Sequence, residues 1–241
     1  MGKMRELERT RMAFTITILA TLLSATNMAN AADESNPVFD PCSDATVAKS
    51  DGFSFGLAFA ANASFFAGEV QFSPCDRRLA LASKHAQLAV FRPQVDQLSL
   101  LTINSTTFDP AKAGGFMVAF AGRNFAARSV PTLVADGTMS ITSFTLVLEF
   151  QTGTLVNLYW KKFGCGSCSG EFRCLNEQDC AIPTKKCRSH GGSVDCEINI
   201  QLAFSGTDKY LETLNSWYEV SSLGQYSLYG LYSNVKENLF M

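Results

Sequence analysis

Apolar and polar residues alternate along several stretches of the second half of the chain, and this alternation predicts β-strands. In "SFTLVLEF", 143–150, apolar residues recur at every second position, and "TLVNLYWKK", 154–162, follows after the pair Thr152-Gly153. Two such runs around a short glycine-containing turn predict a β-hairpin. In its second strand we expect the core-facing residues to be Val156, Leu158 and Trp160.

The most regular alternation is in "CEINIQLAF", 196–204, which is expected to bury Cys196, Ile198, Ile200, Leu202 and Phe204. Weaker runs rich in aromatic and β-branched residues predict further strands. These are Phe53–Ala60, Gln87–Phe91, Leu98–Ile103 and Gly115–Ala121. The pattern as a whole predicts a mainly β fold, an antiparallel β-sandwich or jelly-roll-like domain with a disulfide-rich excursion and one short helix.

The short helix is expected close to residue 210. Asp208 is a candidate N-cap for a segment with apolar residues at helical spacing. Those residues are Tyr210, Leu211, Leu214 and Trp217.

The first 31 residues have the three parts of a secretory signal peptide. Four basic residues precede the apolar run "MAFTITILATLL", 12–23, and the small residues Ala29 and Ala31 form a cleavage site. The apolar run is shorter than the ~20 residues that span a bilayer. We therefore expect a signal peptide, 1–31, and one secreted β-rich domain, 32–241, located outside the cell. Met12 is an alternative start.

Without the leader the chain carries 16 basic and 20 acidic residues, a net charge of −4. The sequence has no basic stripe, so nucleic acid and anionic lipid are not expected partners. Two sequons, at Asn62 and Asn104, fit the secretory route as glycosylation sites.

All eight cysteines follow the leader, in a number and a compartment that favour disulfides. The competing interpretation is a zinc site built on the pair Cys165 and Cys168 with His190, but no second pair has matching spacing. We expect Cys42 and Cys75 to close one loop and the other six to cross-link the excursion, 163–195, a decorated hairpin connection between strands 154–162 and 196–205. The predicted disulfide cysteines are Cys42, Cys75, Cys165, Cys168, Cys174, Cys180, Cys187 and Cys196.

No catalytic constellation is evident, which favours binding over catalysis and leaves no metal or cofactor expected. "GSCSG", 166–170, resembles a nucleophile elbow, but the strand–turn–helix context is absent. A glycosidase would need two carboxylates at a fixed separation, and no spacing singles out a pair. Most candidates are expected to form turns or caps: Asp40, Asp44, Asp51, Asp76, Glu149 and Asp208.

An aromatic stretch near the C-terminus is the candidate ligand-binding surface. Aromatic rings bind the apolar faces of sugars, although the same rings also fill cores. The candidates are Trp217, Tyr226, Tyr229 and Tyr232.

Several blocks resemble a family of secreted land-plant proteins known as Expp proteins. They are "NPVFDPCSDATV", "SDGFSFGLAFA", "SPCDRRLAL", "AVFRPQVD", "SLLTIN", "LAFSGTDKYLETLNSWYEV" and "QYSLYGLYSN". The resemblance covers essentially the whole mature chain and implies a protein of the apoplast or cell wall. It carries over no fold, activity or functional residue.

The expected function is therefore a secreted, disulfide-stabilised binding module for cell-wall polysaccharide or an extracellular protein, with no membrane span after leader removal. Two alternatives remain open: an enzyme acting on wall glycans through a carboxylate pair, and a structural or signalling partner of a membrane receptor.

Overall fold

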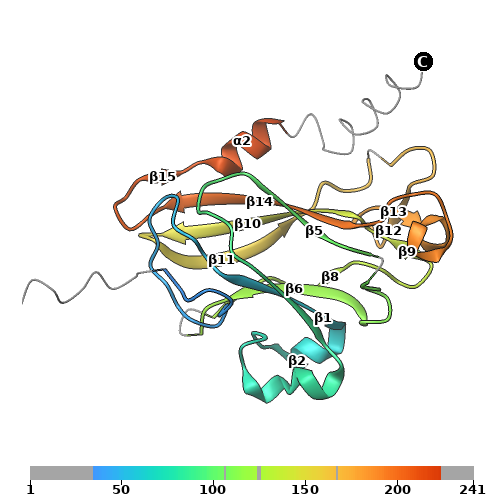
Figure 1. Cartoon of the computed structure of the whole chain (residues 1–241), viewed down its shortest axis with the longest axis horizontal. Coiled ribbons are helices and arrows are strands. Elements are labelled where there is room, and N and C mark those ends of the chain that lie inside the picture. Colours follow the sequence, from blue (N-terminus) through green and yellow to red (C-terminus); the bar gives the residue numbers. More distant parts are fainter. Residues whose placement is uncertain (1–34, 106, 124–125, 167, 224–241) are drawn as a thin grey trace, which may run out of the picture. The chain divides into compact units, whose positions relative to one another are not determined.

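The alternating runs form two five-stranded β-sheets that pack face to face (Figure 1). The structure is a computed structural model, and it describes residues 35–105, 107–123, 126–166 and 168–223. Most neighbouring strands are antiparallel, so the predicted mainly β sandwich is confirmed. Among the described residues, no helix is long and apolar enough to span a membrane.

Sheet I has the order β4-β1-β6-β7, and β8 also pairs with β6. Its strands are β1 (Phe55–Ala61), β4 (Gln87–Phe91), β6 (Gly115–Ala121), β7 (Ala127–Arg128) and β8 (Thr132–Leu133). Sheet II has the order β11-β10-β14-β15, and β5 also pairs with β14. Its strands are β5 (Ser99–Ile103), β10 (Ser143–Gln151), β11 (Thr154–Lys161), β14 (Ile198–Thr207) and β15 (Thr213–Leu214).

Short elements make up the rest of the described fold. The remaining strands are β2 (Phe66–Ala67), β3 (Val70–Gln71), β9 (Met139–Ser140), β12 (Arg173–Leu175) and β13 (Asp179–Pro183). The 3-10 helices are η2 (Asn62–Phe65), η3 (Arg77–Leu79), η4 (Leu81–Lys84), η5 (Thr184–Lys186) and η6 (Arg188–His190), and the α-helix is α2 (Ser216–Leu223).

The main core lies between the two sheets. Leu57 and Met117 of sheet I and Leu148 of sheet II are fully buried there in one apolar cluster. A buried polar contact also joins the layers, because Ser129 Oγ accepts hydrogen bonds from Trp160 Nε1 and from the backbone N–H of Ala119, each at 2.9 Å. Buried donors of this kind need an acceptor, so Ser129 allows Trp160 to enter the core.

The predicted hairpin is β10 and β11, joined at Thr152 and Gly153. Both turn residues have positive φ, 50° and 77°, as a tight hairpin turn requires. The core face of β11 differs from the prediction at one position: Leu155 is buried, whereas Val156 is 53% exposed. A register shift after Glu149 is the cause, since an extra residue in one strand reverses the alternation beyond it.

The run 196–204 buries the side chains that alternation predicted, Cys196 just before β14 and Ile198, Ile200, Leu202 and Phe204 within it. The neighbours of β14 correct the predicted role of the excursion. β11 and β14 are not paired, because β10 lies between them and runs parallel to β14. The excursion, 163–195, is therefore a crossover connection that passes β10 and not a hairpin connection.

All eight cysteines form disulfides, as predicted: Cys42–Cys75, Cys165–Cys174, Cys168–Cys180 and Cys187–Cys196. Three of the four bonds lie within the excursion and its return. The excursion docks on the sandwich through the buried amide of Gln178, which donates to the carbonyl of Leu133 and accepts from its N–H, at 3.0 and 3.1 Å. Strand β13 pairs with β9 beside this contact.

The helix begins later than predicted. Asp208 does not cap it but closes a tight turn, accepting from the N–H groups of Tyr210 and Glu212. β15 intervenes, and the carboxylate of Asp96 then accepts from the N–H groups of Asn215 and Ser216, each at 2.8 Å, where α2 starts. The cap comes from a residue 119 positions away from Asn215, which sequence spacing along the helix could not reveal.

A lobe formed by residues 62–86 covers the outer face of sheet I. It contains η2, η3 and η4 and lies at the bottom of Figure 1. Phe65 from this lobe forms a second apolar cluster with Ala58, Val118 and Phe120, and the Cys42–Cys75 bond packs against it. Sheet I is thus buried on both faces.

Candidate functional site: an arginine-lined groove

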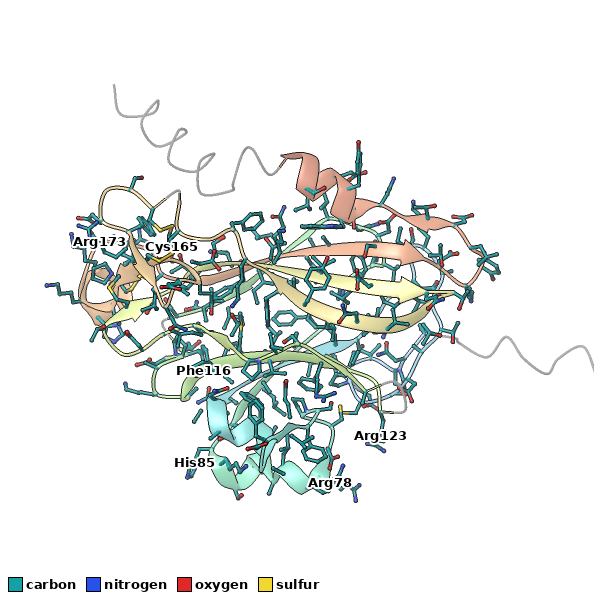
Figure 2. All side chains as sticks on the ribbon, turned by 180° about the vertical axis from the view of Figure 1, so that it is seen from behind. Arg78, His85, Phe116, Arg123, Cys165 and Arg173 are labelled. Carbon is teal, nitrogen blue, oxygen red and sulfur yellow. A yellow bond between two sulfur atoms is a disulfide. The ribbon has the colours of Figure 1, made fainter. Side chains whose placement is uncertain are left out.

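A groove opens where the lobe meets the β7 edge of sheet I. Its volume is about 560 Å³, within the range of small-molecule sites in proteins. One wall is the segment from β3 to η3, and the other is formed by residues 123, 126 and 128. The arginines that line it are Arg77, Arg78, Arg123 and Arg128. Figure 2 shows Arg78 and Arg123 at one corner of the fold and Arg173 at the opposite end.

Specific contacts hold the two walls together. Arg128 Nη2 donates to the carbonyl of Gln71 at 2.7 Å, and Gln71 Nε2 donates to the carbonyl of Ser129 at 2.7 Å. The N–H of Arg123 donates to Asp44 Oδ1, also at 2.7 Å. Because Asp44 follows Cys42 closely and Cys75 lines the groove, the Cys42–Cys75 bond and the Arg123–Asp44 hydrogen bond together link the three chain segments around it.

The four guanidinium groups are not equivalent. Arg78 forms an ion pair with Asp76 and lies over the ring of Phe72, 4.1 Å from its centroid. The hydrogen bond from the Arg78 side chain lowers the pKa of the Asp76 carboxyl to about 2. The guanidinium groups of Arg77 and Arg123 have no hydrogen-bond or ion-pair partner among the described residues. Two exposed cations are therefore available to a ligand.

Four arginines and one carboxylate, that of Asp76, line the groove, and the carboxylate of Asp44 lies beside it, so positive charges exceed negative ones here. Reasoning from net charge missed this cluster, because the chain is acidic as a whole, with a net charge of −2. The doublet Arg77-Arg78 beside Cys75 was the available signal. Its neighbourhood with Arg123 and Arg128 depends on the fold.

The predicted aromatic surface is described only at its beginning. Trp217 lies half-buried on α2, with Lys161 Nζ 6.0 Å from its ring centroid, and the adjacent Tyr218 is 74% exposed. The other three candidates, Tyr226, Tyr229 and Tyr232, lie outside the described residues.

The candidate carboxylates mostly serve local structure, as predicted. Asp40, Asp51 and Asp76 each accept a backbone N–H two or three residues away, and Glu149 accepts from Asn157 across the hairpin. A carboxyl that the sequence did not single out is Asp179, whose pKa burial raises to about 6. No group of three or more His, Cys, Asp or Glu residues in the described part of the chain could hold a metal ion.

Both predicted glycosylation acceptors lie on the surface. Asn62 begins η2 and is exposed, and Asn104 is exposed directly after β5. Neither side chain lines the groove.

A comparison with protein-family models matches the chain to the family described as "Uncharacterised protein DDB_G0273449", over residues 11–142 and 135–236. Searches of curated proteins and of solved structures find no significant match. The two matched segments together include every residue of the groove and of both sheets.

Proposed function

We propose that this chain, which belongs to the family described as "Uncharacterised protein DDB_G0273449", is a secreted extracellular protein that acts by binding. Its ligand is a cell-wall glycan, and the arginine-lined groove is the binding site. The leader, 1–31, and the exposed sequons at Asn62 and Asn104 support export. Four disulfides are compatible with an extracellular location.

The observation that carries the proposal is the groove itself. A concave surface with a few convergent polar groups and apolar walls is typical of ligand sites. Here Val70 and Phe72 supply apolar surface, and Arg77 and Arg123 supply donors without partners among the described residues. Cross-links and backbone contacts hold the walls, which reduces the ordering that binding would otherwise require.

A glycan array probed with the mature protein, 32–241, tests the proposal. We expect a defined subset of wall glycans to be retained. The variant Arg123→Glu should lose them, because it replaces a hydrogen-bond donor by an acceptor. Its thermal stability should stay close to that of the wild type, since the side chain is exposed.

The matched control is Lys185→Glu, which makes the same change of charge at an exposed cation on η5, outside the groove. It should retain the glycans. An array without binding, or equal binding by Arg123→Glu, would contradict the proposal; capture of a membrane receptor in place of any glycan would support the receptor-partner alternative.

A further inference from the structure

We infer that the groove recognises the carboxylates of an acidic glycan, a chain of uronic-acid residues. This inference rests on the proposed function and specifies the class of glycan. It follows from the charge of the groove, from the way a carboxylate already contacts one of its arginines, and from its size.

The groove contains an internal example of the contact. The Asp76 carboxylate accepts from Arg78 Nε at 2.9 Å and from Arg78 Nη2 at 2.6 Å. Two parallel N–H···O bonds are the geometry in which guanidinium recognises planar carboxylates. The stacking of Arg78 on Phe72 further restricts this guanidinium. One arginine of the groove is thus occupied by a carboxylate of the protein.

Arg77 and Arg123 offer the same donors with no such occupant among the described residues. They belong to different walls, Arg77 to η3 and Arg123 to the segment before β7. A ligand that accepts hydrogen bonds from both guanidinium groups must either carry two separate acceptor groups or be a single group that lies between the two walls. A polyuronate carries a carboxylate on each residue, so neighbouring sugars can pair with the two walls.

The volume favours a chain over a single ion. About 560 Å³ accommodates a ligand of several rings, whereas a phosphate or acetate would leave most of the groove filled with water. Val70, which is exposed at the groove, offers apolar surface that suits the C–H faces of a sugar ring and that a small anion would not use.

Titration calorimetry with the mature protein tests the inference on four probes: oligogalacturonate, the same oligomer fully methyl-esterified, dextran sulfate and inorganic phosphate. We expect oligogalacturonate to bind and its methyl ester, which lacks the charge, to bind at least about tenfold more weakly. Raising the salt concentration from about 50 mM to about 300 mM should weaken the binding of the acidic oligomer, because salt screens exposed charges.

Variants locate the contact. The double variant Arg77→Gln/Arg123→Gln should lower the affinity for oligogalacturonate by about tenfold or more, since it removes two charge-assisted contacts. The affinity of Lys185→Gln should stay within about twofold of the wild type, as expected for a charge outside the binding site. Unfolding temperatures of all variants show whether each is folded.

The failures of the inference and of the proposed function are distinguishable. If the methyl ester binds as well as the acid, and the groove variants still lose it, the inference is overturned and the proposed function stands. Tighter binding of dextran sulfate than of oligogalacturonate, or full competition by phosphate alone, also overturns the carboxylate assignment. Absence of binding to any glycan overturns both.

Discussion

The carboxyl group of Asp179 lies at the start of β13 and accepts a hydrogen bond from the N–H of Phe163, at the entrance to the excursion. Burial opposes its ionisation and raises its pKa to about 6, although backbone hydrogen bonds and Lys162 act in the other direction. A residue of this kind makes the stability of the excursion depend on pH.

The sign of the dependence follows from the shift. A carboxyl whose pKa is higher in the folded state binds its proton more tightly there, so its contribution to stability is complete below the unfolded pKa and is lost as pH rises through about 6. We predict that Asp179→Asn removes the part of the pH dependence between about pH 4 and about pH 6 and unfolds at a higher temperature than the wild type at neutral pH. Differential scanning fluorimetry across this range measures both effects.

The control is Glu177→Gln, a change at an exposed neighbour in the same excursion, which should leave the wild-type slope. The window is separate from that of Asp76, whose pKa is lowered to about 2 and whose contribution is lost only in stronger acid. An unchanged slope in Asp179→Asn would show that the buried carboxyl is not the titrating group.

At the scale of elements, the strands were predictable because a buried face imposes alternation. β4 and β6 have the predicted bounds, β10 and β11 form the predicted hairpin, and β14 buries the predicted side. The prediction that Val156 faces the core was wrong because of the register shift in the hairpin. That shift depends on how the two strands pair, and alternation within one strand carries no information on pairing. The predicted start of the helix was wrong for a related reason, since its capping carboxylate, Asp96, comes from a distant part of the chain.

Substitutions at Asp96 test the contribution of this cap to stability. The Asp96 side chain is 1% exposed, accepts from the N–H groups of Asn215 and Ser216 at the start of α2, and pairs with Lys49 Nζ at 2.8 Å. We predict that Asp96→Ala lowers the free energy of unfolding by about 2 kcal/mol, the upper part of the range for lost N-caps, because it leaves the N–H groups of Asn215 and of the buried Ser216 without their acceptor. Asp96→Asn should cost less, since it keeps an acceptor and tolerates the positive φ of 64° at this position.

Urea denaturation of the two variants gives the comparison. A loss in Asp96→Asn as large as that in Asp96→Ala would assign the stabilisation to the ion pair with Lys49 in place of the cap.

For the whole molecule, sequence reasoning predicted the fold class and the disulfide state but not the site. An even number of cysteines after an expected secretory leader favours disulfides, and the alternation favours packed sheets. The groove depends on which segments meet: the lobe, the segment around Asp44 and the β7 edge are separate in sequence and converge through Cys42–Cys75 and the backbone of Arg123. The net charge of the whole chain does not reveal such a cluster, because acidic residues elsewhere outweigh it.

We predict that the Cys42–Cys75 bond supports binding as well as stability. The variant Cys42→Ala/Cys75→Ala should lower the free energy of unfolding by about 2–4 kcal/mol and weaken ligand binding in the groove, because the lobe wall is no longer tied to the segment that holds Arg123. The control Cys187→Ala/Cys196→Ala removes a bond within the excursion and should lower stability while leaving the affinity of the folded protein unchanged. Equal loss of affinity in both variants would contradict the local role.

The central position of β14 sets the order in which the protein is completed as it is synthesised. β5 and β10 are made much earlier, yet both pair with β14, and Cys187 pairs with Cys196 at its entrance. Until residues 198–207 leave the ribosome, β5 and β10 lack the strand that joins them, and the backbone edges that pair with β14 have no partner strand. Parallel and long-range pairings of this kind form slowly and expose aggregation-prone edges. The cell that makes this protein must therefore keep these strands from aggregating, with Cys187 still unpaired, until β14 and Cys196 have been synthesised.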